Sequence, residues 1–118
     1  RRALATSSHR EVWETYATHN PALRNVFDAT VCGLEAPRGK PEPDIYRLAA
    51  QKLGLSPEEC VGVEDSRNGV RSLRAAGCHS VMIPDLLPCD ESLAPYVDTR
   101  LDDLSQLCAL VDRLNGEG

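Results

Sequence analysis

The stretch that decides the fold is Cys60-Val61-Gly62-Val63-Glu64-Asp65-Ser66-Arg67-Asn68-Gly69. Its apolar start, residues 60–63, predicts a buried strand that ends on two adjacent carboxylates, Glu64 and Asp65. A helical pattern follows, with an apolar face made by Val70, Leu73 and Ala76. Gly77 predicts the C-terminal end of that helix.

Two interpretations of the paired acids are open. Adjacent carboxylates at the end of a buried strand repel each other and lose hydration unless a cation joins them. A hard divalent ion, Mg²⁺ above all, accepts one or two carboxylates together with other oxygen ligands. In the alternative, Asp65 or Ser66 only caps the next helix, and Glu64 points to solvent.

Composition excludes several classes of function. The chain has 118 residues, enough for one domain with a single core, and its 42% hydrophobic content is ordinary for a globular protein. A net charge of −5 with no basic cluster disfavours nucleic-acid binding. No apolar run approaches the roughly 20 residues of a membrane span. The five cysteines are odd in number and widely spaced, with no Cys-x-x-Cys pair, which predicts reduced thiols in a cytoplasmic protein.

A hydroxyl cluster, Thr6-Ser7-Ser8, follows a short strand predicted over 2–6. Ser8 to Glu11 matches a Ser-x-x-Glu capping box, and a helix with the apolar stripe Val12, Trp13, Tyr16 and Ala17 is expected next. Hydroxyls before a helix N-terminus favour anion binding. Ser8 alone is explained by capping, so Thr6 and Ser7 are the better candidates for a functional role.

A lysine, Lys40, stands directly before Pro41-Glu42-Pro43-Asp44. Most loop lysines are simply hydrated. Here the two prolines restrict the backbone and prepare the start of a helix, which lowers the entropic cost of aiming the ammonium group.

The remaining segments alternate between strand-like and helical patterns. A short helix is predicted over 21–27, strands over 28–32 and 80–83, and a helix around residues 45–53 that ends at Gly54. Residues 86–95 read as a loop, 96–98 as an edge strand, and 104–114 as an amphipathic helix. The alternation predicts a doubly wound α/β parallel sheet in one domain spanning residues 1–118.

Three motifs occur in order at the ends of successive predicted strands: Thr6-Ser7-Ser8, Gly39-Lys40-Pro41-Glu42-Pro43-Asp44, and Gly62-Val63-Glu64-Asp65-Ser66-Arg67-Asn68-Gly69-Val70. Together they resemble the haloacid dehalogenase (HAD) superfamily, in the branch of beta-phosphoglucomutase and sugar-phosphate phosphatases. The similarity extends from about residue 3 to residue 115. It implies a Rossmann-like core.

The resemblance implies a role for each matched residue. Thr6 would hydrogen-bond the transferring phosphoryl group beside the Ser7 backbone N–H, and Ser8 and His9 would contact the rest of the substrate. Lys40 would neutralise phosphoryl oxygens. Glu64 and Asp65 would be Mg²⁺ ligands. These groups suit phosphoryl transfer, which depends on positioning and charge compensation.

The sequence also departs from the family pattern. The Asp-x-Asp motif that carries the nucleophile and the general acid/base is absent, and so is the helical cap between the first two motifs. The chain starts at Arg1-Arg2 and therefore resembles the C-terminal part of a larger core domain. In the family the missing strand lies between the strands ending at Thr6 and Glu64. We expect a gap of roughly 10 Å there, with two apolar edges, and an unstable isolated chain. An N-terminal segment or a strand-swapped partner chain would fill the gap.

The leading expectation is Mg²⁺-dependent hydrolysis of a small phosphorylated metabolite, with a sugar phosphate as the first choice. The reaction would pass through an aspartyl-phosphate on a nucleophile upstream of this chain. One alternative is a phosphomutase. Another is a non-catalytic fragment that binds phosphate or metal.

Overall fold

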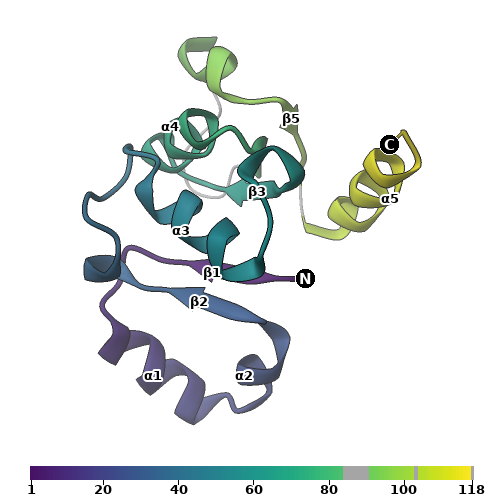
Figure 1. Cartoon of the computed structure of the whole chain (residues 1–118). Helices are drawn as coiled ribbons and strands as arrows, with labels where there is room; N and C mark the ends of the chain where they lie inside the picture. Colours follow the sequence, from purple (N-terminus) through teal and green to yellow (C-terminus); the bar gives the residue numbers. More distant parts are fainter. Residues whose placement is uncertain (84–90, 103, 118) are drawn as a thin grey trace.

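The computed structural model describes residues 1–83, 91–102 and 104–117 as five short parallel strands that alternate with helices (Figure 1). The strands are β1 (Ala3–Ala5), β2 (Ala29–Val31), β3 (Val61–Glu64), β4 (His79–Met82) and β5 (Thr99–Arg100). The α-helices are α1 (Arg10–His19), α2 (Ala22–Val26), α3 (Asp44–Leu53), α4 (Arg67–Ala76) and α5 (Leu107–Glu117). The predicted α/β class is confirmed.

The described strands form two sheets rather than one. β1 pairs in parallel with β2, with Ala3 opposite Ala29. β3, β4 and β5 form the second parallel sheet, with Val61 opposite His79 and Val81 opposite Thr99. No ladder joins β1 to β3. The interruption therefore lies where we expected it.

Helix α3 connects the two halves of the molecule. It packs on β1 and β2 and also contacts α4 (Figure 1). Helix α4 in turn covers β3 and β4. One core cluster joins Val31, Ala36, Ile45 and Ala49, and another joins Leu73, Ala76 and Cys78. Tyr46 packs against both clusters. Its ring therefore bridges the cores of the two sheets.

Local sequence signals explain several boundaries. Gly54 and Gly77 end α3 and α4 with φ of 73° and 93°, a region that glycine enters without a steric penalty. Ser66 caps α4, because its hydroxyl accepts the Gly69 N–H at 3.0 Å. Ser66 thus fulfils the capping part of the alternative interpretation, whereas Glu64 does not point to solvent.

Four expectations were wrong in detail. Ser8 does not cap α1: the N-cap residue is His9, which makes no side-chain capping bond. Within the predicted apolar stripe, Val12 and Tyr16 are exposed and only the other half faces inward. Residues 91–95, expected as loop, lie in a 3-10 helix over Glu91–Tyr96, and the edge strand is β5 rather than 96–98.

Two further points concern the cysteines and the apolar character of the helices. The four described cysteines are free thiols, which agrees with the prediction of reduced cysteines; Cys89 lies outside the described residues. Among the helices that the structure describes, none has the length and apolar character to cross a membrane.

Candidate active site

An ion pair joins the two halves of the molecule at the carboxyl ends of their strands. Lys40 Nζ lies 2.5 Å from Glu64 Oε2, although the two residues are 24 positions apart in the chain. Both side chains are largely buried, with 13% and 8% of their surface exposed. A buried pair of this kind is far less screened than a surface pair. The two charges therefore interact strongly with one another.

The Glu64 carboxylate is held by more than Lys40. The Tyr46 hydroxyl donates to the same oxygen, Oε2. Burial and then the Glu64 charge raise the pKa of the Tyr46 hydroxyl, so it stays protonated and available as a donor. The second oxygen, Oε1, faces the start of α4 and lies 3.4 Å from Ser66 Oγ. This position is favourable for a carboxylate because of the helix dipole.

Gly69 provides the space for this arrangement. A Cβ atom at position 69 would lie 2.0 Å from Glu64 Oε1 and 2.1 Å from its Cδ. Any larger residue would displace the carboxylate. The sequence alone presented Gly69 only as part of a motif, whereas the structure gives it a steric reason.

Asp65 differs from its neighbour. Its side chain is exposed, and it forms no hydrogen bond or ion pair with the described residues. A free carboxylate at the end of a parallel strand fits a Mg²⁺ ligand, and Glu64 Oε1 could add a second oxygen. Nowhere in the described ranges do three acidic, histidine or cysteine side chains gather closely enough to hold an ion. Water or other groups would therefore have to complete the coordination.

Hydrogen bonds hold the Thr6-Ser7-Ser8 turn at the end of β1. Thr6 Oγ1 accepts the Ser8 N–H at 3.1 Å, so the hydroxyl hydrogen remains free to donate elsewhere. The Ser8 carbonyl accepts the Gly33 N–H at 2.8 Å. A Cβ on Gly33 would lie 2.7 Å from the Ser7 carbonyl oxygen, so this close approach requires glycine.

A small hollow of about 230 Å³ brings part of the predicted site together. Ser7, His9 and Lys40 line it, together with residues 33–34, residues 36–39 and Ile45. Thr6, Ser8, Glu64 and Asp65 do not belong to its lining. The structure thus joins Lys40 to Ser7 and His9 on one side and to Glu64 on the other.

The loop that carries Lys40 is held by contacts that the sequence alone did not predict. Arg38 pairs with Asp44 at 2.8 Å and with Glu42 at 3.2 Å, and the hydrogen bond from Arg38 lowers the pKa of Asp44. Buried Ser72, on α4, donates to the Glu42 carbonyl at 2.6 Å. The Lys40–Pro41 peptide is cis. The prolines predicted a restricted loop, but the Arg38 ion pairs and the Ser72 hydrogen bond could not be predicted without the fold.

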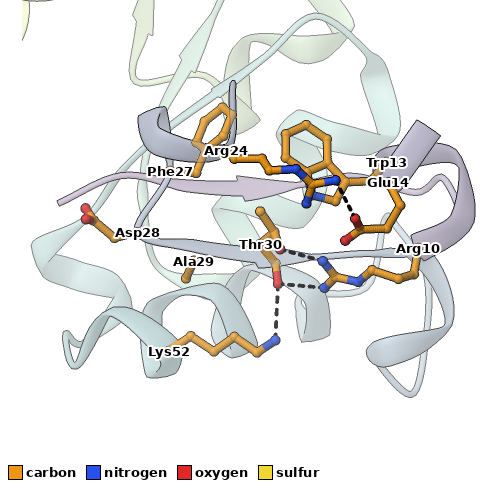
Figure 2. Close-up of a pocket in the computed structure, with 9 residues that line it drawn as sticks. All are labelled: Arg10, Trp13, Glu14, Arg24, Phe27, Asp28, Ala29, Thr30 and Lys52. Atoms are coloured by element: carbon orange, nitrogen blue, oxygen red, sulfur yellow. Dashed lines mark hydrogen bonds and ion pairs between the residues drawn. The ribbon is translucent and has the colours of Figure 1, made fainter. Parts of the chain in front are cut away.

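A larger hollow of about 500 Å³ lies along the outer edge of β2, lined by residues from α1, α2, β2 and α3 (Figure 2). The cationic side chains that line it already have partners within the protein. Arg24 pairs with Glu14 at 2.9 Å, and Arg10 and Lys52 donate to the Thr30 carbonyl (Figure 2). Because none of the predicted site residues lines this hollow, we do not assign the reaction to it.

Comparison with known proteins identifies the family of the chain. The family model for haloacid dehalogenase-like hydrolases matches residues 1–77. The chain belongs to this family. The family resemblance stated from the sequence is confirmed.

Three relatives illustrate the similarity. Hexitol phosphatase A of Escherichia coli K12 is 46% identical over 105 residues, covering 89% of this chain and 47% of that protein. The crystal structure of CbbY from Rhodobacter sphaeroides in complex with phosphate is 38% identical, with a TM-score of 0.64 over 71% of this chain and 37% of the other. A Thermotoga maritima protein described as a candidate beta-phosphoglucomutase is 28% identical, with a TM-score of 0.79 over 93% and 51%. The chain thus spans about half the length of its relatives.

Proposed function

We propose that this chain forms the phosphate-binding and metal-binding half of a Mg²⁺-dependent phosphohydrolase that acts on a small phosphorylated metabolite. The observation that carries the proposal is the buried Lys40–Glu64 pair with exposed Asp65 beside it. The name of hexitol phosphatase A supports a sugar phosphate as the substrate class, and the phosphate bound to CbbY supports a phosphate-binding site.

Each residue has a defined role in this proposal. Lys40 neutralises the oxygens of the phosphoryl group, and Thr6 with the Ser7 N–H donates hydrogen bonds to them. Ser8 and His9 contact the remainder of the substrate. Asp65, assisted by Glu64, would hold Mg²⁺, which compensates charge on the phosphoryl oxygens when it is bound.

The nucleophile belongs to the interruption between β1 and β3. An aspartate on a strand at that place would attack phosphorus and release the substrate alcohol, leaving an aspartyl-phosphate. Water would then break that bond and release inorganic phosphate. An N-terminal segment or a partner chain would supply the strand.

The direct test is Mg²⁺-dependent phosphate release from an aryl phosphate and a sugar-phosphate panel, by the native protein and by the 118-residue chain alone. We expect turnover by the native protein, strongly reduced by Asp65→Asn, and none by the isolated chain. Turnover by the isolated chain that Asp65→Asn abolishes would overturn the placement of the nucleophile. A native protein that releases no phosphate from any substrate would overturn the hydrolase proposal.

A phosphomutase is the second candidate, favoured by the description of the Thermotoga maritima protein. A mutase passes the phosphoryl group back to a sugar instead of to water. Activity that depends on a catalytic amount of sugar bisphosphate would identify it. Binding of phosphate and Mg²⁺ without any turnover would leave a non-catalytic binding role.

A further inference from the structure

Tyr46 occupies an unusual position for a residue of a packing helix. It lies in the first turn of α3, and its ring packs against the core clusters of both sheets. The same side chain reaches the proposed site, where its hydroxyl contacts Glu64 and its ring lies 5.1 Å from Lys40 Nζ. A ring that only filled the core would not need a polar end at this point.

Two donors meet on one oxygen atom. Lys40 Nζ and the Tyr46 hydroxyl both bind Glu64 Oε2, whereas Oε1 turns toward Ser66 and Gly69. Rotation of the Glu64 carboxylate would disrupt both contacts at once. Lys40 also lies over the Tyr46 ring, an arrangement that attracts a cation. Tyr46 therefore acts on the ammonium group directly through its ring and indirectly through Glu64.

We infer that Tyr46 is a positioning residue that fixes the Lys40 ammonium group through Glu64, an inference whose functional meaning rests on the proposed phosphate-binding role of Lys40. The hydroxyl holds the carboxylate in one orientation, and the carboxylate holds the lysine. Because the ring is packed in the core, the position of its hydroxyl at the site is fixed by the position of α3. Tyr46 itself touches neither the phosphoryl group nor the metal.

The decisive variant is Tyr46→Phe in the native protein, because it keeps the ring and removes only the hydroxyl. Hydrogen exchange of the Lys40 ammonium protons, followed by ¹⁵N NMR with labelled lysine, measures how firmly the group is held. We expect exchange about tenfold faster than in the wild type, the factor for losing one hydrogen bond to a charged group. Tyr16→Phe, at an exposed tyrosine on α1, is the matched control and should change nothing.

Glu64→Gln tests independently whether Tyr46 acts on Lys40 through the Glu64 carboxylate. It should also release Lys40, and adding Tyr46→Phe to it should cause little further change, because Tyr46 acts through the carboxylate. Unchanged Lys40 exchange in Tyr46→Phe would overturn the inference. Equal effects of Tyr46→Phe with and without Glu64 would overturn it as well, since they would indicate a role that bypasses the carboxylate.

The affinity for inorganic phosphate separates this inference from the proposed function. Tyr46→Phe should weaken phosphate binding several-fold when Lys40 is present and leave it unchanged in a Lys40→Met background. If the wild type binds no phosphate while Tyr46→Phe still frees Lys40, the proposed function fails and the positioning role stands. If phosphate binds but Lys40 is equally ordered in both proteins, the positioning role fails and the function stands.

Discussion

The two edges of the β1–β2 pair are built in opposite ways. β1 bonds with β2 on both sides of Thr30, so the Thr30 carbonyl points away from β1, toward the outer edge. There it accepts hydrogen bonds from Arg10 and Lys52, both at 3.1 Å (Figure 2). Two residues further along the chain, the Cys32 N–H points to the same side and donates to Glu35 Oε1. Charged groups thus occupy the outer edge.

The inner edges, which face the interruption, have no such cover. The alternating ladder directs the backbone groups of Ala3 and Ala5 in β1, and of Val61 and Val63 in β3, toward the gap. Among the described residues no charged side chain bonds to these groups. Proteins commonly block strand edges that must stay unpaired. The contrast supports our proposal that another strand fills the interruption.

The largest expected effect separates two lysines, one beside each edge. Lys40→Met should lower phosphatase activity of the native protein about 1,000-fold, because it removes a preorganised charge from the phosphoryl group. Lys52→Met, which removes only a contact to the outer edge, should stay within about twofold of wild type. Steady-state rates with a sugar phosphate measure both. Equal losses would remove the functional distinction between the two edges.

The next effect concerns the stability that a strand in the gap between β1 and β3 would add. A strand that pairs with β1 and β3 should stabilise the chain by several kcal/mol, since it buries apolar edges and adds two ladders. Denaturant unfolding of the isolated chain and of the native protein measures the difference. Amide exchange at Val61 and Val63 should slow in the native protein far more than at Gly62, which already faces β4. Equal stability of the two proteins would contradict the proposed strand.

Sequence reasoning predicted the features that are encoded locally. Gly54 and Gly77 end helices as expected, because a left-handed C-cap is decided by one residue. The apolar run before Glu64 predicted β3 to within one residue. The three motifs predicted the family, and the strand order they imply placed the interruption between β1 and β3.

Features that depend on tertiary contacts were missed. Ser8 failed as a helix cap because its N–H and carbonyl bind Thr6 and Gly33, which moves the start of α1 to the next residue. The helical spacing predicted one apolar stripe of four residues on α1, but only its members Trp13 and Ala17 face inward. The Tyr46–Glu64 contact joins residues 18 positions apart. No spacing rule encodes such a pair.

A smaller effect should follow from opening the outer edge. Arg10→Gln removes the paired hydrogen bonds to Glu35, at 2.7 and 2.8 Å, and the bond to the Thr30 carbonyl. We expect a loss of about 2 kcal/mol of unfolding free energy and concentration-dependent self-association. Arg24→Gln is the matched control, because Arg24 lines the same hollow and pairs with Glu14, and among the described residues none of its bonds goes to β2. Light scattering and unfolding should separate the two variants.

The smallest effect is the acid dependence of the outer edge. Hydrogen bonds from Arg10 lower the pKa of Glu35 from its usual 4.5 to about 2, against the opposing effect of burial. Because the folded pKa lies below the unfolded one, this contribution is complete above about pH 4.5 and is lost as the pH falls toward 2. One third of the Glu35 side chain is exposed, so solvent screening limits the contribution to about 1 kcal/mol.

Glu35→Gln isolates this contribution from those of other carboxylates, which are present in both proteins. The difference in unfolding free energy between wild type and Glu35→Gln should be constant from pH 7 to 5 and shrink between pH 4.5 and 2. The site at the inner edges should be indifferent to the substitution, so phosphatase activity at neutral pH should be retained. A stability difference that does not vary with pH would mean that Glu35 holds the edge through its shape and hydrogen bonding rather than its charge. Packing and neutral hydrogen bonds, rather than charge, would then cover the outer edge of β2. Charge would no longer be what distinguishes it from the inner edges of β1 and β3.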